Sequence, residues 1–132
     1  MPSELKLTVQ LTYDILFSTL SSLLCSAVES GGISYWASVK RGKKPKNYNN
    51  TPEDKDYYYL SYPLNEGGSI IVIDHEEDGK EHTLDLPKII EGLQVMGSQY
   101  PHHLKNILAE TEDATTADAL VQCAIFGEVI YG

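Results

Sequence analysis

The sequence predicts an α+β fold in which an antiparallel meander of about four strands packs against a long N-terminal helix and two or three C-terminal helices. Between residues 13 and 29, apolar residues recur at three- and four-residue steps, which is typical of a helix. The middle of the chain carries short β-branched and aromatic runs separated by glycine turns, and helical spacing returns after residue 87. A length of 132 residues with 42% apolar content predicts one domain spanning 1–132.

The charge of the chain is unevenly distributed. The formal net charge is −9, yet five of the ten basic residues fall between residues 40 and 46. The rest of the sequence carries −14, because nineteen acidic residues are offset by only five other basic residues. A surface of this sign repels phosphates, so we expect no direct binding of nucleic acid and a protein partner with a basic surface instead.

Nothing in the sequence indicates an oxidising or membrane environment. Cys25 and Cys123 fall on apolar helix faces, where we expect free thiols that act as small hydrophobes in a reducing cytoplasm. The first residues lack the basic and apolar regions of a signal peptide. Serine and threonine interrupt the longest apolar segment, 13–28, so we expect a soluble cytoplasmic protein without a membrane span.

The N-terminal part is expected to hold a strand followed by the long helix. Residues 5–11 are rich in Leu, Thr and Val, which favours a strand. Thr12 is a suitable N-cap for a helix over 13–29, and the Ser-Gly-Gly sequence at 30–32 is suited to end it.

Two strands and a long loop are expected next. The alternation over 33–39 predicts a strand with Tyr35 and Trp36 on opposite faces. Residues 40–56 contain Gly, Pro and Asn without hydrophobic periodicity, which predicts a flexible loop. The tyrosine-rich run 57–62 predicts the next strand, which ends before a proline.

A hairpin is expected in the centre of the chain. Residues 69–74 are mostly Ile and Val, and the Glu-Gly-Gly sequence before them is suited to a turn. Asp78 and Gly79 favour a tight connection, with positive φ at the glycine, to a strand over 81–86.

The C-terminal part is expected to be helical. Pro87 fits the first turn of a short helix that ends near Gly97, and helical spacing resumes over 102–109. A last helix is capped by Thr115 or Thr116, has Asp118 in its first turn and ends at Gly127. The apolar tail 129–131 is expected to add an edge strand or to pack on a partner.

The hairpin tip is the main candidate for metal chemistry. Residues 74–85 overlap a calcium-loop pattern, but the twelfth position is Asp85 rather than Glu and the flanks are strands, which favours a solvated tip. His75 and His82 could face each other across the hairpin and bind a transition metal together with Glu77 or Asp74. A hairpin tip offers such ligands without a second shell of supporting residues, so we expect no cofactor.

Catalytic motifs are missing from the sequence. No Ser or Cys lies in a glycine-flanked elbow between a strand and a helix, and no glycine-rich loop ends in Lys-Ser or Lys-Thr. His102 and His103 cannot both face one ligand, because adjacent helical side chains diverge. The sequence therefore favours a protein that is not an enzyme.

Tyrosines cluster next to the basic segment. Some of their rings must lie on the outer face of a strand, where Tyr beside Arg and Lys is typical of a binding surface, although packing within the sheet explains them as well. An isolated basic patch could also pair with the acidic surface of a second copy in a homodimer. The candidate binding residues are Lys40, Arg41, Tyr48, Tyr57 and Tyr59.

Three short motifs stand out in the chain. Residues 31–36 read Gly-Gly-Ile-Ser-Tyr-Trp, 67–69 read Gly-Gly-Ser, and 126–132 read Phe-Gly-Glu-Val-Ile-Tyr-Gly. With these motifs the chain resembles a family of small uncharacterised phage and prophage proteins, whose members end in a Phe-Gly-Glu-Val-Val-Tyr-Gly type sequence. The chain departs from the family in one extra residue before the first glycine pair and in the segment 40–56. The resemblance implies a biological setting but no active site.

The resemblance implies a non-catalytic, anti-CRISPR-like inhibitor of a host defence system, because small acidic phage proteins often have this role. It would act in the host cytoplasm by binding a host protein, such as a nucleic-acid-binding effector, through an acidic surface. One alternative is a sponge that binds a nucleotide immune signal at the basic and tyrosine residues, and a second is a metal-dependent enzyme that uses His75 and His82. The candidate acidic surface comprises Glu76, Glu77, Asp78, Glu110, Glu112 and Asp113.

Overall fold

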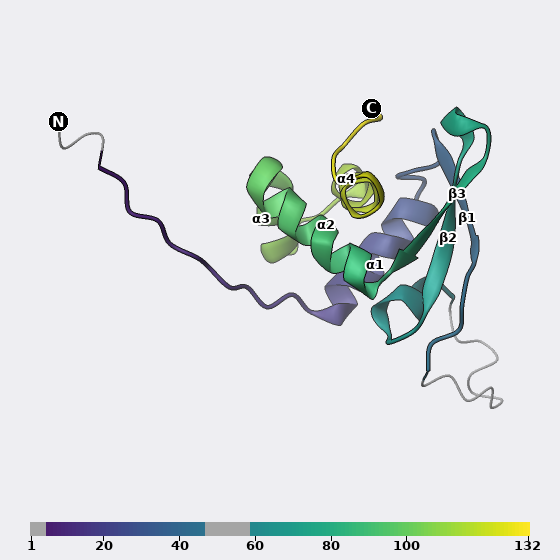
Figure 1. Ribbon diagram of the computed structural model, residues 1–132, viewed down its shortest axis with the longest axis horizontal. Coiled ribbons are helices and arrows are strands. Elements are labelled where there is room, and N and C mark those ends of the chain that lie inside the picture. The colour runs from purple at the N-terminus through teal and green to yellow at the C-terminus, as the bar shows by residue number, and fades with distance from the viewer. Residues whose placement is uncertain (1–4, 47–58) are drawn as a thin grey trace.

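Four α-helices and a small antiparallel sheet make up the described part of the protein, residues 5–46 and 59–132 of a computed structural model. This arrangement confirms the α+β class (Figure 1). In chain order the elements are α1 (Phe17–Val28), β1 (Ala37–Arg41), the 3-10 helix η3 (Tyr59–Leu64), β2 (Ser69–Asp74), the 3-10 helix η4 (His75–Glu77), β3 (Lys80–Asp85), α2 (Leu86–Gln99), α3 (Pro101–Leu108) and α4 (Ala114–Phe126).

Within the described residues the sheet has three strands in the order β1-β2-β3, one fewer than the sequence suggested. Both pairings are antiparallel, and Val72 of the central strand lies opposite Val39 and His82. Ile70, Val72 and Leu84 are almost fully buried on one face of the sheet. All four α-helices lie on that side (Figure 1). The Ile and Val run therefore forms the central strand, where β-branched side chains pack best.

Helix α4 lies at the centre of the core. Residues 116–124 are all buried, because α1, α2 and β3 surround the helix. The crossing with α2 is close: a Cβ on Gly92 would lie 2.8 Å from the backbone nitrogen of Ala124. Such a helix needs apolar residues all round rather than on a single stripe, and its many alanines allow neighbours to approach closely.

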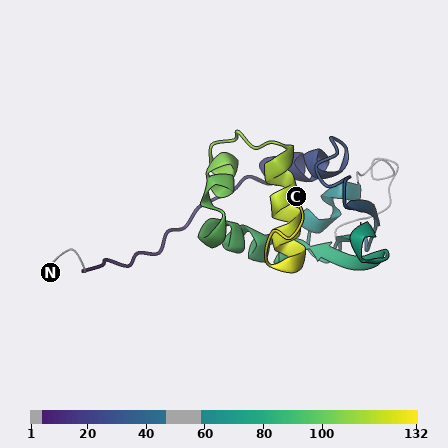
Figure 2. The same ribbon diagram turned by 90° about the horizontal axis from the view of Figure 1, so that it is seen from above.

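The predicted strand over 5–11 is wrong, and so is the predicted start of the first helix. Residues 5–16 form no regular structure, and α1 begins only at Phe17, after Leu16, without a side-chain cap from Thr12. The segment leaves the body of the protein as an extended arm (Figures 1 and 2). A strand requires a hydrogen-bonded neighbour, and the described residues provide none.

Two other predicted strands are replaced by tighter turns. Residues 33–36 form a turn in which Trp36 N–H donates to Ile33 O, so that both Ile33 and Trp36 are buried, and only the second half of the expected strand belongs to β1. The tyrosine-rich run forms η3 over its described part, whereas Tyr57 and Tyr58 lie outside the described residues. Pro63 lies within η3 and suits it better than a strand, because proline donates no ladder hydrogen bond.

The hairpin and the C-terminal helices largely follow the prediction. Asp78 and Gly79 both have positive φ, but η4 makes the connection longer than a tight hairpin. Helix α2 continues past Gly97, α4 is capped by the Asp113 side chain rather than by a threonine, and Gly127 ends α4 at φ 74°. Both cysteines are free, as expected. In the described ranges, no helix is long and apolar enough to cross a membrane.

Candidate functional site

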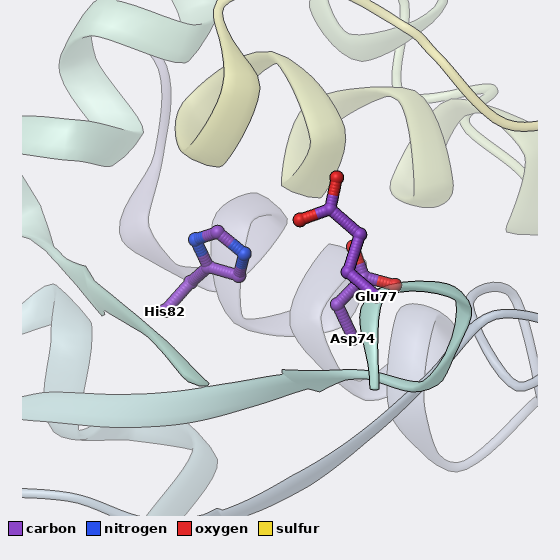
Figure 3. A group of neighbouring side chains, drawn as sticks. All are labelled: Asp74, Glu77 and His82. Atoms are coloured by element: carbon purple, nitrogen blue, oxygen red, sulfur yellow. The ribbon is translucent and has the colours of Figure 1, made fainter. Parts of the chain in front are cut away.

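Three side chains with metal-ligating atoms converge where the β2–β3 hairpin meets the helices. Potential ligand atoms of Asp74, Glu77 and His82 all lie within 4.8 Å of one another (Figure 3). Asp74 ends β2 and caps η4 by accepting from the Glu76 N–H at 2.9 Å. The left-handed conformations of Asp78 and Gly79 then return the chain to β3, which carries His82.

The cluster lies partly in the protein interior. Asp74 has no exposed surface, and its Oδ2 accepts a 2.8 Å hydrogen bond from the Tyr131 hydroxyl. His82 packs edge-on against the Phe126 ring at 5.2 Å, and its buried Nε2 has no hydrogen-bond partner among the described residues. Burial, and then the charge of Lys80, lower the pKa of His82, so the imidazole is neutral at neutral pH.

His75 does not belong to this cluster, so the expected pairing of His75 with His82 is wrong. The Nε2 atom of His75 lies 2.8 Å from Ser38 Oγ on the exposed outer side of the sheet. This Ser-His pair is solvent-exposed and lacks the water-excluded surroundings that favour nucleophilic catalysis. Sequence spacing could not distinguish the two histidines, because the η4 turn decides which of them faces the helices.

A second polar cluster, formed around Asp118, escaped the sequence analysis. Asp118 is only 8% exposed and accepts hydrogen bonds from Tyr35 Oη at 2.6 Å, from Trp36 Nε1 at 2.9 Å and from Gln122 Nε2 at 2.9 Å. Gln122 Oε1 in turn accepts from the backbone N–H groups of Ile130 and Tyr131, both at 2.8 Å. The cluster therefore fastens the C-terminal tail to α4, and the expected edge strand at 129–131 is wrong.

A hollow opens beside the Asp118 cluster, at the corner formed by the first glycine pair. Its lining includes Gly31, Tyr35, His103 and Asp118. Burial raises the pKa of Tyr35 to about 12, with further contributions from its hydrogen bond to Asp118 and from the charge of that carboxylate. The Tyr35 hydroxyl is therefore a hydrogen-bond donor at neutral pH rather than a base.

Of the candidate nucleotide-binding residues, the structure describes Lys40, Arg41 and Tyr59. Lys40 and Arg41 are neighbours in β1, so their side chains point to opposite faces of the sheet. Lys40 Nζ pairs with Glu81 Oε2 at 2.8 Å, and the Arg41 guanidinium lies 5.2 Å from the centre of the Tyr59 ring. Tyr48 and Tyr57 lie outside the described residues.

The candidate acidic residues fall into two separate groups. Glu76, Glu77 and Asp78 lie at the hairpin tip, and the second group lies in the connection from α3 to α4, far from that tip (Figures 1 and 2). Part of the second group has structural roles: Glu110 Oε1 accepts from Thr19 Oγ1 at 3.5 Å, and Asp113 caps α4. The second group comprises Glu110, Glu112 and Asp113.

The arm, residues 5–16, is the largest departure from an ordinary globular surface. Over residues 5–13 the apolar residues occupy alternate positions, and each is between 53% and 89% exposed. The polar residues between them include Lys6, Thr8 and Gln10. The alternation of apolar and polar residues is visible in the sequence, but the exposure of the apolar side chains is not. The five alternating apolar residues are Leu5, Leu7, Val9, Leu11 and Tyr13.

No family assignment accompanies these features. A comparison of the chain with protein-family models, with curated proteins and with solved structures finds no match in any of the three.

Proposed function

We propose that the protein is a non-catalytic binding protein that engages another protein through the arm. The single observation behind this proposal is the set of five alternating apolar side chains that the fold leaves in solvent. Isolated exposed apolar residues are ordinary, but a contiguous apolar stripe on a soluble protein is typical of an interaction surface.

The spacing of the stripe suits a β-strand added to the edge of another sheet. Successive residues point to opposite sides of a strand, so the five apolar side chains, which occupy every second position, can all contact one surface while the backbone pairs with the partner's edge. Burying each Leu or Val side chain contributes about 1.5–3 kcal/mol before the cost of ordering the arm.

The partner is a protein with an open sheet edge beside an apolar surface. Lys6 and Asp14 are the only charged residues of the arm, so its contact depends little on charge. The net charge of −9 adds a preference for basic partners. The narrower form of the proposal, an inhibitor of a host defence effector, follows from the resemblance to phage proteins and from this acidity.

Paired arm variants test the proposal. Leu7→Lys combined with Val9→Lys places two charges on the apolar side of the arm, and Thr8→Lys combined with Gln10→Lys places the same charges on its polar side. We expect the first variant to lose a partner recovered from bacterial lysate and the second to retain it. Both variants should fold like the wild type, because the side chains concerned are exposed.

Salt dependence separates the arm from the acidic surface. An arm contact should persist at about 0.5 M salt, where charge interactions are largely screened, whereas binding through the acidic residues should be lost. Equal retention of the partner by both arm variants, or recovery of no partner at all, would contradict the proposal.

A homodimer is a second candidate, favoured by the two open edges of the sheet. Within the described residues β1 and β3 each pair with β2 alone, so the arm of one copy can add to an edge of another. Light scattering coupled to gel filtration should then give twice the monomer mass of 14.7 kDa, and Leu7→Lys with Val9→Lys should restore the monomer. A monomer at all concentrations would exclude this candidate.

A further inference from the structure

We propose that Asp74, Glu77 and His82 form a binding site for a divalent first-row transition metal ion, with zinc as the best-suited ion. The site is independent of the arm and of its partner. It differs from the histidine pair expected from the sequence, because it uses two carboxylates and one imidazole from three consecutive elements: the end of β2, η4 and β3.

The distances suit a metal with little rearrangement. All three potential ligand atoms lie within 4.8 Å of one another. Oxygen and nitrogen ligands lie about 2.0–2.2 Å from zinc, which places them about 3–4 Å apart around the ion. The difference can be closed by a rotation of Glu77, which is exposed and lies on the short η4 turn. In Figure 3 the ring of His82 turns one nitrogen toward the Glu77 carboxylate.

The unpaired nitrogen of His82 is the strongest observation in favour of this site. Its Nε2 is buried and finds no hydrogen-bond partner among the described residues, although buried polar atoms are nearly always paired. A metal ion binds an imidazole through a nitrogen lone pair, and no described residue hydrogen-bonds to this nitrogen. A simple histidine-carboxylate hydrogen bond would also satisfy this atom, but the structure shows none.

Neighbouring groups already hold the buried carboxylate in place. Asp74 Oδ1 accepts from the Glu76 N–H and Oδ2 from the Tyr131 hydroxyl, which leaves further lone pairs on both oxygens for an ion. Hydrogen bonds of this kind orient metal-bound carboxylates in known sites. Because Tyr131 belongs to the C-terminal tail, an ion at Asp74 would stabilise the hairpin tip and the tail together.

The ligand set selects the class of ion. One imidazole nitrogen with two carboxylate oxygens suits zinc and its neighbours in the first transition row, whereas calcium requires six or more oxygen ligands. Three protein ligands leave one tetrahedral position for water. Because Asp74 also holds the C-terminal tail through the Tyr131 hydroxyl, the expected role of the ion is stabilisation of the hairpin tip and the tail.

Calorimetric titration of the metal-stripped full-length protein with ZnCl₂ tests the site. We expect one ion per chain and a rise in melting temperature with zinc that EDTA reverses. Glu77→Gln and His82→Gln should each weaken binding by roughly 10-fold or more. Matched controls lie on the same turn: Glu76→Gln and His75→Gln change exposed residues outside the cluster and should bind zinc like the wild type.

Three results would overturn the site. These are no zinc binding by the wild type, equal binding by Glu77→Gln and His82→Gln, or loss of binding with His75→Gln. Equal binding would show that zinc occupies another position, such as the neighbouring His102 and His103 rings, whose centres lie 4.0 Å apart. Glu77→Gln is informative even if His82→Gln fails to fold, because Glu77 is exposed.

Discussion

At the scale of single residues, Asp118 is the centre of a buried hydrogen-bond network that the sequence did not predict. It is a nearly buried carboxylate that accepts from three donors, two of which lie on the turn preceding β1 and one on the next turn of α4. Buried carboxylates are tolerated when hydrogen bonds replace lost hydration. Asp118 therefore joins the glycine corner, α4 and, through Gln122, the tail.

Replacing Asp118 should destabilise the protein strongly. Asp118→Ala leaves the buried Trp36 Nε1 without its acceptor, and because hydrogen bonds to charged groups each contribute about 1.5–3 kcal/mol, we expect a loss of about 3 kcal/mol or more in the free energy of unfolding. Urea unfolding followed by Trp36 fluorescence measures it. Tyr35→Phe removes one donor on a half-exposed ring and should lower the free energy of unfolding by about 1 kcal/mol. Equal losses in the two variants would contradict this role of Asp118.

At the scale of elements, the contact between α2 and α4 determines how closely the helical layer packs. Gly92 faces the backbone of Ala124, so the two helices approach at a point where neither carries a large side chain. Gly97 lies on the same helix, but its nearest neighbour is a methyl group of Leu104, a flexible side chain. The two glycines of α2 therefore have different roles.

Alanine substitutions should separate these roles. Gly92→Ala places a Cβ 2.8 Å from the Ala124 backbone nitrogen, and we expect a loss of about 1–3 kcal/mol from overpacking. Gly97→Ala can be accommodated by Leu104 and should be neutral or stabilising by up to about 1 kcal/mol, because alanine favours helix. Thermal unfolding of both variants provides the measurement. A stabilised Gly92→Ala protein would show that the crossing can relax.

At the scale of the whole molecule, the protein consists of a closed body and an arm outside it. The body encloses one continuous core to which every α-helix contributes, and Ile15, next to α1, is the one residue of the arm that packs against that core among the described residues. Two histidines of the body, His82 and His103, have lowered pKa values because of burial, in separate regions of the structure. Protonation of these two histidines at acid pH should therefore lower the stability of the body.

Stability should fall as the pH drops below about 6.5, the ordinary pKa of histidine. Burial, and then the charge of His102, lower the pKa of His103, whereas Asp113 and Asp118 raise it. The unfolded chain thus binds more protons than the folded chain, so this stabilisation is complete above the unfolded pKa and is lost as pH falls toward the folded one. Melting temperatures of EDTA-treated protein at about pH 7.5 and about pH 5 test this.

The variant His103→Gln provides the control for acid sensitivity. It should reduce the dependence of melting temperature on pH but not abolish it, because His82 shifts in the same direction. If the melting temperature of the variant depends on pH as strongly as that of the wild type, His103 does not contribute to the acid sensitivity. Its Nδ1 lies 3.1 Å from Thr116 Oγ1, a contact that glutamine can also make.

The sequence by itself determined the elements whose signals are local. Helical spacing located α1 and α4, the Ile and Val run located β2, and Asp78 with Gly79 located the hairpin. These signals depend on backbone preferences and on side-chain periodicity within one segment, so they can be identified without knowing what the segment contacts.

Tertiary structure decided everything that depends on a neighbour. Residues 5–11 have the alternation of a strand but pair with no strand among the described residues, and 33–36 form a turn because Ile33 and Trp36 are both buried in the core. The η4 turn, rather than sequence spacing, places His82 instead of His75 beside Asp74 and Glu77. Pairing and burial join residues that are far apart in the chain, and periodicity within one segment contains no information about them.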